Sequence, residues 1–379
     1  MQDYTKSTLA IRYIGRVLPV LRYGGELPPL PEGTDLETVF RVAKMHSLAS
    51  SLWYAIEPTV RATGNTPLIE KWEAARSMGF AQNMVQTREF AALTALFTAE
   101  KIKFLPMKGF LFKELWARPE HRTMADMDFL FEEKDLPRVA ELLIARGYRV
   151  EVEEGEVHDT YDKPPYLHVE AHRSLFKGEA VSFDDWLTKE DNPYWHYMSP
   201  EDFLAFNVGH INKHYVNGGC GARSLFDVYL FIRERGDSID PMKLEAALRS
   251  RDLYDFYHQL LHLVYFWYAD GEYPFTPDPR YIKDGAPTDA LLEMEHFIMT
   301  GGAYGSMDNR VDYNVEHRGK LGYMLRLAFP SYRTMRSLYR PVRKCPLLLP
   351  FVYPYRWVKY LFNGRVKQYW KLIFRKEKK

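Results

Sequence analysis

The sequence predicts an α+β fold in which a small sheet-and-helix unit is embedded in a mostly helical chain. Through most of the first hundred residues, and again after residue 199, apolar residues recur every third or fourth position, which indicates helices. Between residues 102 and 173, short apolar segments instead alternate with polar residues, which indicates strands. We therefore expect a helical region at 1–100, an α/β core at 101–198, a helical domain at 199–300, and a loop with a basic aromatic C-terminal region at 301–379.

The first region is expected to hold three helices. Residues 1–23 form the first, and the Gly/Pro-rich segment 24–33 ends it because neither residue suits a helix interior. Thr34 and Asp35 are placed to cap a second helix that runs to about Ile56. The third helix is expected from Pro67 to about Glu100.

The α/β core begins with a strand over 104–107, a turn at Lys108-Gly109 and a helix over 110–116. A turn that opens into a helix is a suitable anion site, because free backbone N–H groups and the helix dipole point the same way. The elements expected next are a strand at 123–131, a helix at 136–146 ending at Gly147, a strand at 148–153, a polar turn at 154–163 and a strand at 166–173.

Helices return after a capping segment at 199–202. We expect them at 203–215, 223–235, 241–250, 253–269 and 289–299. Residues 300–320 are rich in Gly, Asn and charge, so we expect a loop there before the aromatic and basic tail.

Composition is ordinary for a soluble globular protein, with 46% hydrophobic and 27% charged residues among 379. The two cysteines, Cys220 and Cys345, cannot form a disulfide framework, which favours a reducing compartment. The N-terminus lacks the apolar core of a signal peptide, and no stretch of 18 apolar residues occurs. We therefore expect a cytoplasmic location.

Two carboxylates, Asp126 and Asp128, fall on one face of the strand expected at 123–131. Like charges about 4 Å apart repel by roughly 4 kcal/mol at an effective dielectric constant near 20, so the pair is unfavourable without a cation. Mg²⁺ commonly takes one or two protein carboxylates and completes its shell with water and phosphate. The spacing thus predicts a site for metal and phosphate.

A third carboxylate, Glu170, lies on the alternating strand at 166–173 with His168 and His172 on its face. Glu170 is the candidate to join the two aspartates. The two histidines allow three interpretations: zinc ligands together with Glu170, polar neighbours of the carboxylates, or surface residues.

The chain resembles the nucleotidyltransferase fold of the DNA polymerase β superfamily in four motifs: Lys108-Gly109, Arg122-x-x-x-Asp126-x-Asp128, a helix ending in Gly147-Tyr148, and His168-x-Glu170-x-His172. It is most similar to the bacterial family called uncharacterised nucleotidyltransferase, which is related to the AbiEii-type toxins. The resemblance extends from the N-terminal helices to about residue 270. It implies a mixed β-sheet of the nucleotidyltransferase type.

By this resemblance, Asp126, Asp128 and Glu170 hold divalent metal, and Glu170 also helps to activate the attacking hydroxyl. Lys108 and Gly109 would cradle phosphate. Arg122 would neutralise developing charge. The implied activity is that of a metal-assisted transferase that moves NMP from an NTP to a hydroxyl acceptor, with Mg²⁺, or Mn²⁺, as cofactor.

The chain departs from the broader superfamily at the phosphate turn, where Gly-Ser is usual but Phe110 follows Gly109. The serine contact to phosphate is therefore missing.

Two i, i+4 pairs lie on the expected helices, His210 with His214 and Arg223 with Asp227. One interpretation is that they are structural ion pairs or caps between packed helices. The alternative is that Lys213, His214 and Arg223 bind the nucleotide or the acceptor, since similar positions recur in the family that the chain resembles.

The tail is strongly basic: residues 331–379 hold 14 Lys and Arg against Glu377 alone, a net charge of about +13, and the other 330 residues sum to about −12. It fits a segment packed on the body, a membrane-surface helix or a nucleic-acid platform. Two other functions compete with NMP transfer: a catalytically inactive nucleotide- or partner-binding module, and a toxin-like enzyme that modifies RNA or tRNA ends. Nothing in residues 200–379 identifies the acceptor.

Overall fold

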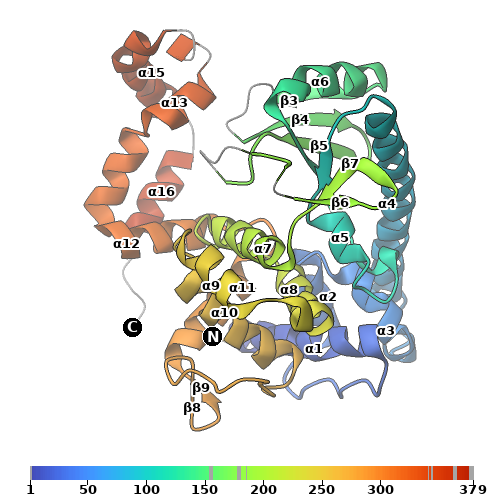
Figure 1. The fold of residues 1–379 in the computed structure, drawn as a ribbon. Coiled ribbons are helices and arrows are strands. Elements are labelled where there is room, and N and C mark those ends of the chain that lie inside the picture. The colour runs from blue at the N-terminus through green and yellow to red at the C-terminus, as the bar shows by residue number, and fades with distance from the viewer. Residues whose placement is uncertain are drawn as a thin grey trace.

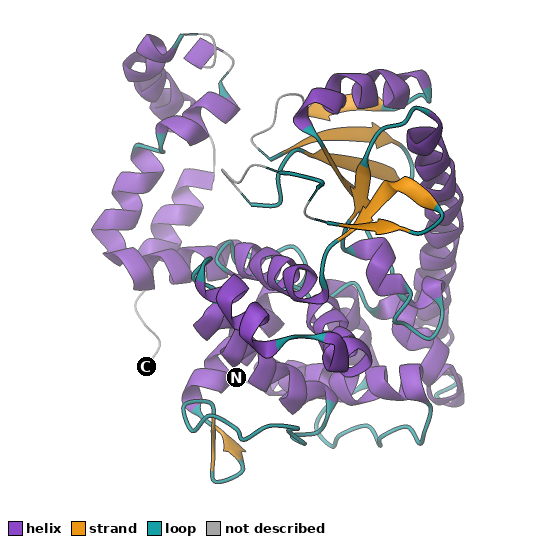
Figure 2. Ribbon diagram, in the orientation of Figure 1, coloured by secondary structure: helices purple, strands orange, loops and turns teal. Residues whose placement is uncertain are grey.

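The computed structural model describes residues 2–152, 157–176, 181–184, 186–339, 341–342, 345–361 and 365–374. These residues form a helical body, a sheet unit above it and a C-terminal helical arm to one side (Figure 1). Figure 2 shows that nearly all strands lie in the one sheet unit and that helices make up the rest. The expected α+β fold class is confirmed.

Four helices make up the first region: α1 (Gln2–Tyr23), α2 (Leu36–Met45), α3 (Ala49–Ala62) and α4 (Thr66–Ala99). The single helix expected from Thr34 to Ile56 is wrong, because the chain turns at Ser47, which has φ 59°. The turn is fixed by a tertiary contact: the buried His46 ring accepts a hydrogen bond from the Ala222 amide at 3.1 Å and donates one to the Met299 carbonyl at 3.3 Å. The predicted Asp35 cap is present, since its carboxylate accepts from the Thr38 amide at 2.7 Å.

The seven-stranded sheet has the order β3-β4-β5-β2-β1-β7-β6. Its strands are β1 (Phe104–Pro106), β2 (Met127–Phe131), β3 (Arg149–Val152), β4 (His158–Lys163), β5 (Leu167–His172), β6 (Leu187–Lys189) and β7 (Asn192–Tyr197). The sheet is mixed, because β2 pairs parallel to β5 and β1 parallel to β7, whereas the other pairs are antiparallel. The parallel β2–β5 pair places Asp128 directly beside Glu170.

Three expectations for the sheet unit are wrong. The polar turn expected at 154–163 includes strand β4, whose polar sequence is accommodated because buried Asp159 accepts from Arg173 at 2.6 Å. Strands β6 and β7 were not expected. The strand expected at 123–131 begins only at Met127, because the carbonyl of Met124 is bound by the side-chain amides of Gln82 and Gln86.

Two short helices accompany the sheet: α5 (Gly109–Lys113), which ends before the expected Trp116, and α6 (Leu136–Ala145). The helical body continues with α7 (Pro200–Tyr215), α8 (Ala222–Arg235), α9 (Pro241–Arg249), α10 (Tyr254–Tyr268) and α11 (Asp289–Gly301). A two-stranded hairpin, β8 (Ile282–Lys283) with β9 (Ala286–Pro287), lies between α10 and α11. The helices expected after residue 199 are therefore all present.

Two large hydrophobic cores hold the molecule together, and α4 contributes to both. The first joins the N-terminal helices to α7–α11 and includes Ile14, Trp72, Phe226, Trp267 and Ile298. The second lies between the sheet, α6 and the end of α4, and includes Phe97, Phe104, Phe129, Val139 and Val169. The region 1–100 thus shares a core with the region 199–300, although the division into four domains stays a prediction.

The loop expected at 300–320 is wrong. Helix α12 (Met307–Ala328) begins there, capped by Ser306, whose hydroxyl accepts from the Asn309 amide at 3.1 Å. Gly319, at φ 68°, interrupts the helix with a kink. After α12 the arm continues with α13 (Tyr332–Leu338), α15 (Leu349–Leu361) and α16 (Arg365–Ile373). Within the described residues, no helix combines the length and apolar character needed to cross a membrane.

Candidate active site

The turn between β1 and α5 provides the first side of the site. Lys108 has φ 41°, and the helix begins at Gly109, where an added Cβ would lie 2.8 Å from the Met124 sulfur. The Lys108 ammonium is buried and donates to Asp128 Oδ1 at 2.9 Å. Burial opposes its charge, but the carboxylates of Asp128, Asp126 and Glu170 outweigh burial and raise the pKa of Lys108. The lysine therefore stays charged beside the carboxylates.

Three carboxylates meet on the neighbouring strands. Asp126 precedes β2, Asp128 lies on β2, and Glu170 is the β5 partner of Asp128. Each of the three offers an oxygen within 4.8 Å of the others. Burial by itself would raise the pKa of Glu170, but the hydrogen bond from His172 and the charge of Lys108 lower it to about 2. Glu170 is thus ionised at neutral pH.

His172 neutralises part of this charge. Its Nε2 lies 3.0 Å from Asp128 Oδ1 and 3.1 Å from Glu170 Oε2, and because ionised carboxylates only accept, it donates to them. Burial lowers the pKa of His172, but these two carboxylates raise it above its usual value. Lys108 and His172 therefore both donate hydrogen bonds to the clustered carboxylates.

The predicted His168–Glu170–His172 zinc set does not form a single cluster. His168 turns to Asp162, whose carboxylate accepts from its Nδ1, while His172 faces Asp128 and Glu170. Instead, His158 joins Glu170 and His172, with its Nδ1 3.7 Å from Glu170 Oε2. His158 was missed because it lies on β4, in the segment expected to be a turn, opposite His172 in the register.

Helices α7 and α8 close the other side of the site; Figure 1 shows α7 at the boundary between the sheet unit and the helical body. The walls enclose a cavity of about 60 Å³, lined by Lys108, Gly109, Phe112, Arg122, Met124, Asp126, Asp128, Asn207, His210, Ile211, Arg223, Ser224 and Asp227. The cavity thus contains most of the residues that the sequence singled out. Asn207 and Ser224 were missed, because no motif marks them.

His214 lies just behind this cavity and contacts it through His210. The two Nε2 atoms are 3.0 Å apart, so one ring must donate to the other. Burial is the main reason that the pKa of each is lowered, and it falls well below its usual value for His210. Both rings are therefore neutral at neutral pH.

The two arginines of the site differ in their partners. Arg122 is committed to Asp227 through two hydrogen bonds of 2.9 and 2.7 Å, and it also donates to the Gly109 carbonyl at 3.2 Å. Arg122 thus joins the turn between β1 and α5 to α8, and the role in neutralising charge that the resemblance implies stays a prediction. Asp227 pairs with Arg122 rather than with Arg223, the partner that the i, i+4 spacing suggested.

Arg223 carries a charge without a carboxylate partner. One of its terminal nitrogens donates to the Thr123 carbonyl, but Nε has no partner, and the structure records no ion pair for it among the described residues. Burial, and then the charge of Arg122, lowers its pKa. An arginine in such a position is suited to an anionic ligand.

Arg223 also borders a second, larger cleft of about 500 Å³ on the opposite side of Met124. Its lining is mostly apolar, with Phe40, Met78 and Tyr304, and it includes Lys44 beside them. The cavity and the larger cleft therefore share a wall formed by Met124 and Arg223.

The model of a family described as uncharacterised nucleotidyltransferase matches residues 32–269. The chain belongs to this family. The matched segment runs from the start of α2 through the sheet and the cavity to the end of α10, so it includes every candidate site residue. Membership supports general nucleotidyl transfer with an NTP as substrate. The predicted family is confirmed, and the relation to AbiEii-type toxins stays a prediction.

Two solved structures resemble this nucleotidyltransferase family member. One is the solution structure of the antibiotic-resistance factor ANT(2'')-Ia, with TM-score 0.36, 15% identity, and 46% of this chain and 97% of that chain covered. The other is the lincosamide antibiotic adenylyltransferase LnuA bound to lincomycin, with TM-score 0.31, 18% identity, and 38% and 94% covered. A search of curated proteins finds no match.

Proposed function

We propose that the chain transfers NMP from an NTP to a hydroxyl acceptor, with a divalent cation held by Asp126, Asp128 and Glu170. One observation carries this proposal: two carboxylates on neighbouring strands and a third, Asp126, just before one of these strands converge beside a cavity that also contains Lys108 and Arg223. Such a site pairs ligands for a cation with cations for a polyphosphate.

The donor set fits Mg²⁺, or Mn²⁺. All three candidate ligands are hard carboxylate oxygens, and two such charges about 4 Å apart repel by roughly 4 kcal/mol at an effective dielectric constant near 20. The His158–Glu170–His172 group would suit zinc better, but His172 already donates to two of the carboxylates. When bound, the cation would lower the pKa of the attacking hydroxyl and offset charge on the phosphates.

The chain's own residues would bind and orient the donor. The acceptor hydroxyl gives up its proton to water and its oxygen forms a bond to the α-phosphorus, while the bond from the α-phosphorus to the bridging oxygen of the β-phosphate breaks and pyrophosphate leaves. Lys108 and the Gly109 amide would bind the leaving phosphates, and Arg223 would bind them from α8. With a pKa of about 2, Glu170 is a weak base, so we assign it mainly to holding the cation.

The larger cleft supports a place for the nucleoside of the NTP. It has room for one, it is mostly apolar, and it meets the phosphate cavity at Arg223. Binding of inorganic triphosphate tests the phosphate part of the site alone, because this ligand has the phosphates of an NTP but no nucleoside. Replacing Ala75 in the cleft by Trp should weaken ATP binding while leaving triphosphate binding unchanged.

The function is tested by comparing Asp128→Asn with wild type in binding of Mg²⁺-NTP and in transfer of label from NTP to components of a cell extract. Asp128→Asn should lower Mg²⁺-dependent binding and transfer by at least about a hundredfold, because a cation ligand is lost. Asp237→Asn is the matched control, since Asp237 is exposed and does not line the cavity.

Wild-type transfer that Asp128→Asn leaves intact would contradict the proposal. Binding of Mg²⁺-NTP without transfer to any component of the extract would favour the inactive binding module. Label found only in RNA would identify the acceptor as the RNA class.

A further inference from the structure

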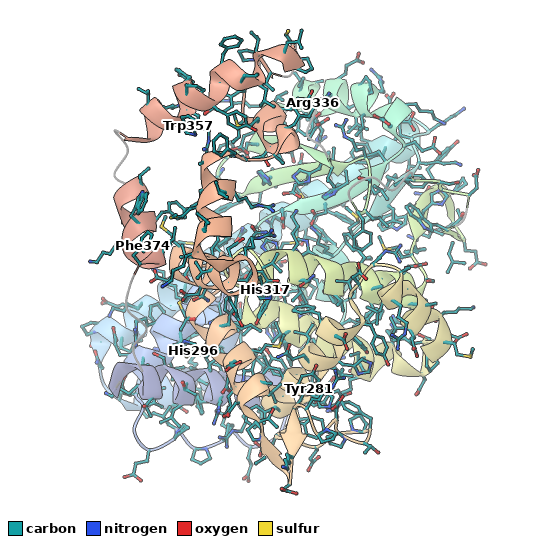
Figure 3. The ribbon with its side chains drawn as sticks, turned by 90° about the vertical axis from the view of Figure 1, so that its left-hand side faces the viewer. Tyr281, His296, His317, Arg336, Trp357 and Phe374 are labelled. Carbon is teal, nitrogen blue, oxygen red and sulfur yellow. The ribbon has the colours of Figure 1, made fainter. Side chains whose placement is uncertain are left out.

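The last part of the chain has an unusual charge distribution. Residues 317–376 contain 15 Lys and Arg and no Asp or Glu. Most of them belong to the C-terminal arm, which we define as residues 321–374 where described: the end of α12, then α13, α15 and α16. Figure 3 looks onto this arm, with Arg336, Trp357 and Phe374 labelled on it.

The inward faces of the arm are already occupied. On α16, Ile373 packs with Val311 and Tyr323 of α12. On α15, the Tyr353 hydroxyl donates to the Pro330 carbonyl and Trp357 Nε1 to the Ala328 carbonyl, each at 2.7 Å. The orientation of α15 is therefore fixed, and so is the face that it turns outward.

That outward face is apolar. Among the residues that the structure describes, 13 of the 24 exposed large hydrophobic side chains lie in the arm. On α15, Phe351, Tyr355 and Val358 are 74%, 59% and 56% exposed, and their i, i+4, i+7 spacing makes a continuous stripe. On α12, Leu321 and Leu325 repeat the pattern. A concentration of this kind marks an interaction surface.

The positive charges lie on the same helices. Arg326, Arg336, Lys359 and Lys371 are exposed, and the structure records no ion pair for these four within its described residues. Their charge is thus available to a negatively charged partner.

We propose that the C-terminal arm docks on an anionic phospholipid surface. Leu, Phe and Val side chains enter the boundary between headgroups and acyl chains, while Lys and Arg contact the headgroups. Tyr355 and Trp370 suit this boundary, where aromatic rings with a polar atom are favoured. The proposal concerns a surface separate from the cavity and does not depend on the proposed function.

Two other partners fit the surface less well. RNA would use the cations and stack on the aromatic rings, but it has no use for the exposed Leu321, Leu325 and Val358. A second copy of the arm would bring two strongly basic surfaces together, and like charges repel.

The test is flotation of the full chain with phosphatidylcholine vesicles, with and without phosphatidylglycerol. We expect binding only to vesicles that contain phosphatidylglycerol, weakening as salt is added. Phe351→Gln/Tyr355→Gln/Val358→Gln and Lys359→Gln/Lys371→Gln should each reduce binding by at least about tenfold. Met242→Gln/Leu187→Gln is the matched control, because these side chains are also exposed but lie outside the arm.

Circular dichroism checks that the variants remain folded, which is expected because all the replaced side chains are exposed. Absence of binding to phosphatidylglycerol vesicles at low salt would overturn the proposal. Equal loss of binding in the Met242/Leu187 control would also overturn it. A mobility-shift assay with single-stranded RNA tests the alternative partner. If the protein binds RNA but not vesicles, and the arm variants abolish RNA binding, the arm is a nucleic-acid surface and the proposal is overturned.

Discussion

Lys113 shows how closely charge is controlled at single residues around the cavity. The structure buries its ammonium, which donates to Asn83 Oδ1 at 2.6 Å. Burial, followed by the charges of Arg122 and Arg223, lowers its pKa to about 7. The carboxylate of Glu120 raises the pKa of Lys113, but this effect is smaller than the cost of burial, unlike the effect of the carboxylates around Lys108.

Lys113 should therefore make stability depend on pH. Its ordinary pKa is 10.5, so between about pH 7 and 10.5 the unfolded chain binds a proton that the native state lacks, and stability rises with pH. Lys113→Met should raise the free energy of unfolding at pH 7 by about 1–3 kcal/mol and flatten this rise. Urea unfolding at pH 7 and 9 measures both effects. Lys243→Met, at an exposed position, should change neither, and a Lys113→Met variant less stable than wild type at pH 7 would refute the expectation.

At the scale of elements, the turn between β1 and α5 packs closely against the loop that carries Asp126. Gly109 leaves room for the Met124 sulfur, which an added Cβ would approach to 2.8 Å. Met124 is in turn held through its carbonyl by Gln82 and Gln86 of α4. Helix α4 thus fixes the spacing between the β1–α5 turn and the carboxylates.

Gly109→Ala should push this loop away and weaken binding of Mg²⁺-NTP by about tenfold, with a loss of about 1–3 kcal/mol in stability. Isothermal titration and urea unfolding measure the two quantities. Gly236→Ala is the control, because nothing lies within 4 Å of its added Cβ. Adding Met124→Ala should relieve the crowding and recover part of the stability. An unaltered Gly109→Ala variant would mean that the turn tolerates a side chain.

The same elements show what the sequence can and cannot predict. The face on which Asp128 and Glu170 each lie follows from the alternation of side chains within a strand, which is a local pattern, whereas their pairing depends on the neighbouring position of β2 and β5. The end of α2 at His46 depends on Ala222 and Met299, far along the chain, and no local signal reports them. Likewise, the polar sequence of β4 can form a strand because its buried Asp159 pairs with Arg173, a contact that no local pattern reports. Asp227 pairs with Arg122, which is 105 positions away in the chain.

Across the whole molecule, α1 is joined to the helical body by an ion pair with a buried carboxylate. Arg12 contacts Glu295 of α11 through hydrogen bonds of 2.8 and 2.5 Å, and Glu295 also accepts from Trp267 Nε1 at 2.8 Å. Glu295 is 3% exposed, so its charge depends on these partners.

Arg12→Met should therefore reduce the free energy of unfolding by about 2–4 kcal/mol, because a buried carboxylate loses its cation. Arg16→Met on the same helix should cost less than about 1 kcal/mol, since Arg16 pairs with exposed Asp270 at 3.8 Å. Calorimetry should show regions 1–100 and 199–300 melting in one transition. Two separate transitions, with Arg12→Met affecting only the first, would restore the separate N-terminal domain.

The contact between Arg12 and Glu295 has a consequence for synthesis on the ribosome. Arg12 leaves the exit tunnel early but must wait for Glu295, which is 283 positions later in the chain. The sheet unit, made of residues between 104 and 197, can assemble meanwhile, whereas α1 cannot complete its core until α11 emerges. Helix α1 therefore exposes its apolar face until α11 has been made, so this chain is expected to be a client of ribosome-associated chaperones.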